Sequence, residues 1–333
     1  MKRFLPLILA TLSAFSGLCA ERDVTIHNRK AGITLGGTLA VPDQNAPSAL
    51  FVLVTGSGAQ NRDEEIMGHR PFKVISDALV SAGYGVLRMD DRGVGESGGN
   101  FSDALLADFA DDALAGVDFM RETYPSTKTG ILGHSQGGEI AIMAAAKEKV
   151  DFIVTLAAPA WKGDSLIMAQ CRALAVASTG SWPNEKLQRN LLDIAMSDLP
   201  DFVAKPLLAN EFFSVMGYEL AKVSEVRDNI YRQVAPLLLP SYKELLRYDP
   251  TDDIVAVKVP WIALNGTLDL QVPVKNLDTI SQLNPKATVV PVEGHNHLFQ
   301  KAVTGLPDEY PTAGQTPSDE TLKILLDEIN NLL

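Results

Sequence analysis

The feature that most constrains this chain of 333 residues is a regular alternation of short apolar runs with longer helical patterns. The runs are rich in Val, Ile and Leu, which is typical of strands buried on both faces of a parallel sheet. They span residues 49–54, 84–89, 129–132, 152–156, 261–264 and 288–292, and helical patterns occupy residues 71–82, 103–122, 139–147, 274–283 and 320–332. Strands that alternate with helices predict a doubly wound α/β fold with a mostly parallel sheet.

Two segments depart from this alternation. Residues 24–27 and 33–41 resemble paired edge strands that end at Pro42. Between residues 161 and 247 no strand pattern occurs, and helical stretches at 165–177, 185–196, 212–220 and 226–239 are separated by prolines, Pro206 among them. The sequence therefore predicts a core formed by residues 21–160 and 248–333, with a helical cap insertion at 161–247 that shapes a ligand pocket.

Composition excludes several classes of protein. Charged residues make up 21% of the chain and hydrophobic residues 46%, which is ordinary for a globular protein and argues against wholesale disorder or a multi-span membrane protein. The formal net charge of −12, without a cluster of Lys and Arg, opposes binding to a phosphate backbone. We therefore expect no nucleic-acid partner.

The N-terminus has the features of an export signal. Lys2 and Arg3 precede an apolar run over 4–15, and small residues lead to Ala20. This pattern predicts a signal peptide of residues 1–20, a periplasmic or secreted protein and no stable membrane insertion. A retained anchor and lipidation at Cys19 are the alternatives. Cleavage after Ala20 would leave Cys171 as the single cysteine, with no internal disulfide.

One segment has the pattern of a serine nucleophile. Residues 133–137 spell G-x-S-x-G directly after the apolar run 129–132 and before a helical pattern. A nucleophilic serine on a tight strand-to-helix turn needs flanking glycines, because neighbouring backbone approaches closely there. A second match, residues 95–99 around Ser97, lies in a loop beyond its strand. We therefore predict that Ser135 is the nucleophile.

A serine hydroxyl needs a base and a group that orients the base. His295 and His297 follow the last apolar run, and we select His297 as the base. Asp269 follows the run 261–264, whereas Asp252, Asp253 and Asp278 lie before that run or in the next helix. The chain order Ser135, Asp269, His297, each after a core strand, is the α/β-hydrolase order. His27, His69 and His134 are interpreted as structural, with His134 facing away from the serine.

The remaining site residues follow from the same topology. Backbone N–H groups of Gln136 and Ser57 are the expected oxyanion donors, with Gly58 left open beside Ser57. Among the large apolar residues of the cap, we expect Trp161, Phe212 and Met216 to line the substrate pocket, although such residues more often form a cap's own core.

No cofactor or metal is expected. The His-x-His at 295 and 297 lacks further ligands for zinc. Residues 93–98 spell G-x-G-x-x-G, but Asp90, Asp91 and Glu96 would place carboxylates where a pyrophosphate must lie. We instead expect Asp90 and Arg92 to fix the carboxyl edge of the sheet.

Five motifs resemble a known family: VTGSGAQNRDE, LRMDDRGVGESGG, GHSQGGEIA, ALNGTLDLQVP and GHNHLFQ, between residues 49 and 299. They are similar to bacterial α/β-hydrolase esterases of the branch related to dienelactone hydrolases, prolyl oligopeptidases and serine aminopeptidases. The resemblance implies that Ser135, Asp269 and His297 form the catalytic triad. Two positions depart from it, since Thr55 stands where a His is frequent, and Gln136 where Glu or Met is frequent.

The expected activity is hydrolysis of small to medium acyl esters by a serine carboxylesterase, through an acyl-enzyme. Two alternatives remain. A peptidase or amidase would need acidic groups in the pocket, for which the cap offers Glu211 and Glu219. The other alternative is a non-catalytic binding protein on a hydrolase scaffold.

Overall fold

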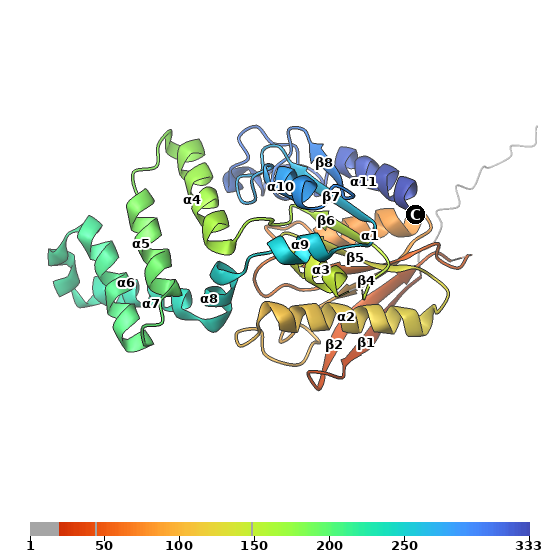
Figure 1. The fold of residues 1–333 in the computed structure, drawn as a ribbon, viewed down its shortest axis with the longest axis horizontal. Helices are drawn as coiled ribbons and strands as arrows, with labels where there is room; N and C mark the ends of the chain where they lie inside the picture. Colours follow the sequence, from red (N-terminus) through yellow and green to blue (C-terminus); the bar gives the residue numbers. More distant parts are fainter. Residues whose placement is uncertain (1–19, 44, 148) are drawn as a thin grey trace, which may run out of the picture.

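The computed structural model describes residues 20–43, 45–147 and 149–333, and its centre is an eight-stranded sheet (Figure 1). The strands lie in the order β1-β2-β4-β3-β5-β6-β7-β8. All pairings from β4 onwards are parallel, which confirms the predicted mostly parallel α/β sheet. The strands are β1 (Ala20–Asn28), β2 (Ile33–Val41), β3 (Leu50–Val54), β4 (Gly85–Met89), β5 (Thr129–His134), β6 (Ile153–Leu156), β7 (Trp261–Gly266) and β8 (Thr288–Val292).

The two antiparallel pairings lie at one edge of the sheet, where β1 pairs with β2 and β2 with β4. The expected signal segment, residues 1–20, lies outside the described residues except for Ala20, the first residue of β1. Within the described ranges, no helix combines the length and apolar character that crossing a membrane requires.

Helices cover both faces of the sheet, as the apolar strands require. On one face Phe51 and Leu53 join a cluster with α1 (Pro71–Ser81) and α11 (Asp319–Leu332). On the other, Leu50 and Val52 join a cluster that includes residues of α2 (Leu106–Thr123), α3 (Gln136–Ala146), α9 (Thr251–Ala256) and α10 (Asn276–Leu283). Side chains of one strand alternate between two buried faces, which explains its unbroken apolar sequence.

The segment between β6 and β7 forms a separate group of helices, here called the helical insertion (residues 161–247). Figure 1 shows it beside one end of the sheet. It has its own apolar clusters, one of which includes Leu208, Phe213 and Val234. Its helices are α4 (Gly163–Thr179), α5 (Glu185–Met196), α6 (Asp201–Met216), α7 (Ser224–Val234) and α8 (Pro240–Arg247), with short 3-10 turns at Tyr218–Lys222 and Ala235–Leu238.

Candidate active site

Ser135 occupies the sharp turn between β5 and α3. Its backbone has φ +53° and ψ −121°, a left-handed conformation that is strained for a residue with a side chain. The turn is held by hydrogen bonds from the Ser135 N–H to the carbonyl of Leu156 (2.8 Å) and from the Gly138 N–H to the carbonyl of Ser135 (2.8 Å). The side chain is thereby presented at the end of the strand rather than buried beneath the helix.

The glycines around Ser135 are required by close backbone packing. A Cβ on Gly133 would lie 2.0 Å from the carbonyl oxygen of Gly137, and a Cβ on Gly137 would lie 2.1 Å from that of Val54. Neither oxygen belongs to a side chain that could move aside. The G-x-S-x-G pattern therefore reflects the packing of this turn against β3.

His297 and Asp269 are paired at the same edge of the sheet. The ring Nδ1 of His297 lies 2.8 Å from Oδ2 of Asp269, and both side chains are buried. The other oxygen, Oδ1, accepts hydrogen bonds from the N–H groups of Gln271 (2.8 Å) and Val272 (2.9 Å). The carboxylate is fixed by backbone donors, so it can hold the imidazole with Nε2 free to exchange a proton.

The loops that carry this pair are bound to each other. The Leu268 N–H donates to the carbonyl of His295 (2.9 Å), and the Gly294 N–H donates to the Thr267 hydroxyl (2.9 Å). His295 is the other histidine considered as the base. Its ring contacts a different residue, with Nε2 at 2.8 Å from the Ser318 hydroxyl. Phe299 is buried in the sheet's apolar cluster and anchors the end of this loop.

The loop after β3 provides the second side of the site. The N–H of Gly56 is engaged, because it donates to Oε1 of Glu64 (2.7 Å). The next residues, Ser57 and Gly58, line a pocket of about 230 Å³ together with Gln136. Gln136 is the first residue of α3, where backbone N–H groups have no partner within the helix. The two expected oxyanion donors therefore belong to residues on the wall of one pocket.

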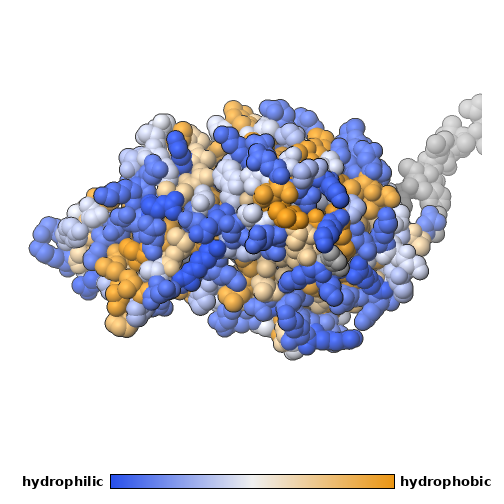
Figure 2. Space-filling model, viewed as in Figure 1, coloured by the Kyte–Doolittle hydropathy of each residue, from blue (hydrophilic) through white to orange (hydrophobic). Residues whose placement is uncertain are grey.

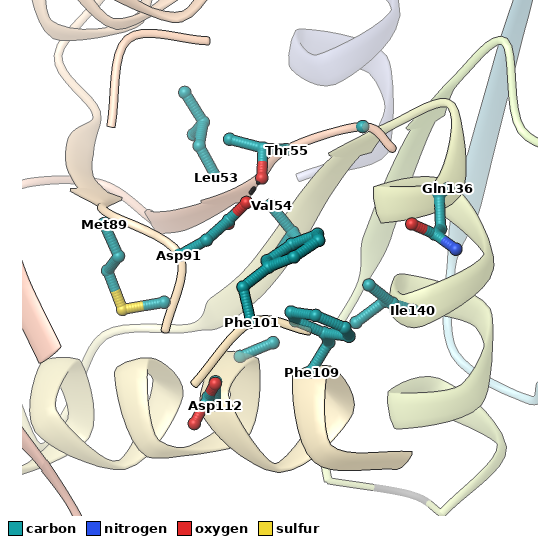
Figure 3. A pocket seen from close by; sticks show the side chains of 12 residues that line it. Leu53, Val54, Thr55, Met89, Asp91, Phe101, Phe109, Asp112, Gln136 and Ile140 are labelled. Atoms are coloured by element: carbon teal, nitrogen blue, oxygen red, sulfur yellow. Dashed lines mark hydrogen bonds between the residues drawn. The ribbon is translucent and has the colours of Figure 1, made fainter. Parts of the chain in front are cut away.

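A smaller cavity of about 30 Å³ adjoins this pocket and shares Phe101, Phe109 and Gln136 with it (Figure 3). Figure 3 shows the two phenylalanine rings close to Ile140. At the other side of the cavity Asp91 accepts hydrogen bonds from the Thr55 hydroxyl (2.7 Å) and from the Gln60 N–H (2.9 Å). Burial raises the pKa of Asp91 to about 7.

The three expected pocket residues lie elsewhere. Trp161 donates its indole N–H to the Thr279 hydroxyl (2.8 Å), Phe212 packs against the apolar cluster of the helical insertion, and the side chain of Met216 is exposed. None of them lines the pocket beside Ser57 and Gln136. That pocket is lined by Phe101 and Phe109, and the insertion contributes Pro236, Leu239, Ser241, Tyr242 and Leu245.

The second G-x-S-x-G match has a structural role. The buried hydroxyl of Ser97 donates to the carbonyl of Asp90 (2.7 Å) and accepts from the Gly36 N–H (2.9 Å). The surrounding G-x-G-x-x-G loop wraps around the Asp90 carboxylate, which is paired with Arg62. Arg92 pairs with Asp112 (2.7 Å). The glycine-rich loop thus encloses a carboxylate and leaves no cradle for a phosphate.

Two buried groups lie near the elbow: His134, interpreted from the sequence as structural, and Glu64, to which the sequence assigns no role. Glu64 lies next to His134, with Oε1 at 2.8 Å from Nδ1, and Nε2 of His134 lies 3.0 Å from the carbonyl oxygen of His297. No local pattern signals this contact, since the residues are 70 positions apart. Within the described parts of the chain, no group of three or more side chains is arranged to hold a metal ion.

Comparisons with known proteins agree with this fold. A family model described as serine aminopeptidase, S33, matches residues 70–240, a range that contains Ser135 but neither Asp269 nor His297. Esterase EstD of Thermotoga maritima is 30% identical over 173 residues, which are 52% of this chain and only 40% of EstD.

Two solved structures share the fold at low sequence identity. The esterase Pf2001 of Pyrococcus furiosus superimposes with a TM-score of 0.57 at 17% identity, over 94% of this chain and 93% of that one. The α/β hydrolase GrgF of Penicillium sp. sh18 gives 0.59 at 17% identity, over 94% and 98%. The α/β-hydrolase fold is therefore confirmed, together with the resemblance to hydrolases of the esterase and serine aminopeptidase branch.

Proposed function

Because the chain belongs to the serine aminopeptidase S33 family and has the α/β-hydrolase fold, we propose that it is a serine hydrolase that cleaves small to medium carboxylic esters. The observation that carries this proposal is the left-handed Ser135 turn at the sheet edge where Asp269 holds His297 at 2.8 Å. The esterase names of EstD and Pf2001 support the choice of substrate class.

In the proposed reaction the Ser135 Oγ attacks the ester carbonyl carbon, and Nε2 of His297 takes the hydroxyl proton. The Asp269 carboxylate stabilises the imidazolium that forms. Backbone N–H groups of Gln136 and Ser57 stabilise the negative charge on the carbonyl oxygen. The proton then passes from His297 to the departing alcohol, which leaves an acyl-enzyme on Ser135, and water attacks this acyl-enzyme by the same sequence.

The pocket supports an acyl group of limited length. The larger pocket of about 230 Å³ opens beside Ser57 and Gln136, and the adjoining cavity of about 30 Å³ extends between Met89, Phe101 and Ile140. Most side chains on the walls of the larger pocket are apolar, Phe101 and Phe109 among them, which suits the acyl chain of an ester. The length of that chain is then limited by Phe101 and Phe109.

The proposal is tested by replacing each of the two serines in the G-x-S-x-G matches. We expect Ser135→Ala to lower kcat for p-nitrophenyl acetate by at least about 10,000-fold, because the nucleophile is lost. Ser97→Ala is the matched control and should keep turnover within about tenfold, since its hydroxyl only bridges Asp90 and Gly36. Retained ester turnover in Ser135→Ala would refute the proposal.

The family description also keeps a peptidase or amidase under consideration. An aminopeptidase needs an acid that receives the substrate's α-amino group. Glu211 accepts a hydrogen bond from Asn190 (2.8 Å), and Glu219 is exposed beside Lys222, so neither expected acid lines the pocket. Asp91 lines the adjoining cavity but is bonded to Thr55 and Gln60. A panel of p-nitrophenyl esters and aminoacyl p-nitroanilides compared by kcat/KM distinguishes the two activities, and faster turnover of the anilides would favour the peptidase.

The third possibility, a non-catalytic binding protein, is tested by labelling with a fluorophosphonate. Covalent labelling that disappears in Ser135→Ala supports an active hydrolase. Absence of labelling in the folded wild-type protein would favour a binding protein.

We further propose that the protein is exported and that residues 1–20 are removed. The supporting observation is the basic and then apolar N-terminal sequence. N-terminal sequencing of the protein from a bacterial periplasm should give Glu21 as the first residue. An intact Met1, or a lipidated Cys19, would contradict this proposal.

A further inference from the structure

A buried carboxylate and a buried imidazole lie directly behind the candidate active site. Glu64 belongs to the loop between β3 and α1, and His134 is the last residue of β5, immediately before Ser135. Their side chains are 5% and 8% exposed. Glu64 also has a positive φ of 52°, a backbone conformation that is strained for a residue with a side chain.

These two side chains connect three separate segments of the site. Oε1 of Glu64 accepts the N–H of Gly56 (2.7 Å) and lies 2.8 Å from Nδ1 of His134. Nε2 of His134 lies 3.0 Å from the carbonyl oxygen of His297. The bond to Gly56 fixes the loop that continues into Ser57. The Glu64–His134 contact lies next to the nucleophile turn, and the contact of His134 with His297 holds the backbone of the candidate base.

The partners of His134 define its protonation. A carbonyl oxygen only accepts hydrogen bonds, so Nε2 must carry a proton. Oε1 of Glu64 accepts the Gly56 N–H and also lies within hydrogen-bond distance of Nδ1, so an ionised Glu64 would accept from a protonated Nδ1 and both ring nitrogens would then be donors. Burial opposes charge on this ring, but the charge of Glu64 and its hydrogen bond outweigh burial and raise the pKa of His134. The contacts of His134 with Glu64 and with the His297 carbonyl are those that an imidazolium paired with a carboxylate would make.

We propose that Glu64 and His134 are positioning residues for the reaction proposed above: they hold the oxyanion loop at Gly56 and the backbone of His297 in register with Ser135. This inference rests on the proposed function. Neither residue touches the reacting atoms. The ring of His134 lies beside that of His297, with centroids 4.9 Å apart, but the contact it makes is to the His297 main chain.

Positioning of this kind acts on the rate of the chemical step. A displacement of about 1 Å in the reacting geometry can lower a rate about 100-fold. The oxyanion loop and the His297 loop leave the sheet after β3 and β8, which are not adjacent in the sheet. Glu64 and His134 bond to both loops, so they hold the two loops at fixed positions relative to Ser135.

Three single variants separate the links. Glu64→Gln keeps the size and an oxygen that can accept from both Gly56 and His134, but it removes the negative charge that faces the His134 ring. His134→Asn keeps a donor near the position of Nδ1 and releases the His297 carbonyl, whereas His134→Gln keeps a donor near Nε2 and releases Glu64. For each variant we expect kcat for p-nitrophenyl acetate to fall about 10- to 100-fold with KM within about twofold of wild type. The double variant E64Q/H134Q should lose no more than the larger single loss, because both changes break one unit.

The matched control is Glu139→Gln, another buried carboxylate close to the elbow, whose Oε2 has no hydrogen-bond partner among the described residues. We expect its kcat to stay within about twofold of wild type near pH 7.

Active sites are counted by fluorophosphonate titration, so a loss of folded protein is not mistaken for slower chemistry. Wild-type kcat in Glu64→Gln and His134→Asn, with Ser135 still essential, would overturn the positioning role and leave the proposed function intact.

A spectroscopic measurement on the wild-type protein tests the inference without catalysis. Nitrogen-15 NMR of labelled histidines should show both nitrogens of His134 protonated between about pH 6 and 8, with the assignment made by loss of the signal in His134→Asn. A single protonated nitrogen at neutral pH would overturn the proposed ion pair. If Ser135→Ala retains ester turnover, the proposed function fails instead, whatever the NMR result for His134.

Discussion

The sheet with its flanking helices and the helical insertion are packed in different ways. Every one of the largest fully buried side chains, Trp261, Phe51 and Phe152 among them, belongs to the sheet and its flanking segments. The helical insertion instead exposes large apolar residues, with Phe202 80% and Tyr218 62% exposed. Figure 2 shows apolar side chains gathered on the lower side of the insertion.

This difference indicates where geometry is fixed and where it can vary. Ser135, Asp269 and His297 all lie on loops and turns anchored in the sheet. The Ser135 N–H donates to Leu156 of β6, and the Asp269 N–H donates to Gly266 of β7. The insertion contributes only one side of the larger pocket. We therefore expect changes next to the elbow to affect both folding and chemistry, and changes in the insertion to leave the chemical step unaltered while affecting local stability or substrate range.

The largest effect should follow from adding a single methyl group at the elbow. A Cβ on Gly137 would lie 2.1 Å from the carbonyl oxygen of Val54 and 2.5 Å from that of Thr55, so backbone must shift. We expect Gly137→Ala to lower the free energy of unfolding by at least about 3 kcal/mol, measured by urea denaturation. Gly180→Ala, at φ +77° with no atom within 4 Å, should lose about 1 kcal/mol from backbone strain. Equal losses would contradict the distinction between sheet and insertion.

The elbow is also the part of the site that sequence could predict. A short apolar strand, a helix and G-x-S-x-G specify a local structure, and the candidate acid and base, Asp269 and His297, follow from their places after strands. The residues that line the pocket could not be predicted from the sequence. Phe101 lies in a loop without a periodic pattern, and only the folded chain brings it next to Phe109 and Gln136. The Glu64 and His134 contact is likewise nonlocal.

The insertion shows a limit of a different kind. The sequence predicted a helix from residue 212 with a break at Pro206, whereas α6 begins at Asp201 and includes Pro206. A proline in the second turn removes a single main-chain donor. Apolar contacts of Ala204, Leu208 and Phe213 within the insertion outweigh that loss. The expectation that a proline ends a helix considers only the local backbone, and it takes no account of such tertiary packing.

A second prediction uses the pH dependence of stability. Burial raises the pKa of Glu139 from 4.5 to about 8 in the folded state. The folded chain therefore binds this proton more tightly than the unfolded chain, so its stabilising contribution is full below about pH 4.5 and is lost as pH rises to about 8. Glu139→Gln should be about 2 kcal/mol less stable than wild type near pH 5, because the buried amide lacks a full set of partners, and about 2 kcal/mol more stable near pH 9, where the wild type must bury a charge.

Urea denaturation at several pH values measures this effect, with Glu219→Gln as the control. Glu219 lies in the helical insertion, exposed beside Lys222, so its removal should change stability by less than about 0.5 kcal/mol at any pH. A wild-type stability that does not decline between about pH 5 and 9 relative to Glu139→Gln would show that Glu139 is not buried as a neutral acid.

A third prediction concerns acyl-chain length. Phe101→Ala should enlarge the pocket beside Gln136. We expect the ratio of kcat/KM for p-nitrophenyl hexanoate to kcat/KM for p-nitrophenyl acetate to rise about tenfold. An effect of this size is typical of one or two methylenes in an apolar pocket. Phe212→Ala, in the insertion's own apolar cluster, should leave the ratio unchanged. If Phe212→Ala shifts the ratio and Phe101→Ala does not, the acyl chain lies against the insertion, as the sequence had suggested.

The smallest effect should come from an exposed side chain of the insertion. Phe202 is on α6 with 80% of its side chain exposed, so Phe202→Ser removes little buried apolar area. We expect the free energy of unfolding to change by less than about 0.5 kcal/mol, with kcat/KM unaltered. Leu208→Ala on the same helix, fully buried, should lose about 2 kcal/mol or more. A loss from Phe202→Ser as large as that from Leu208→Ala would mean that Phe202 is covered in solution, and the insertion would then be packed as tightly as the sheet.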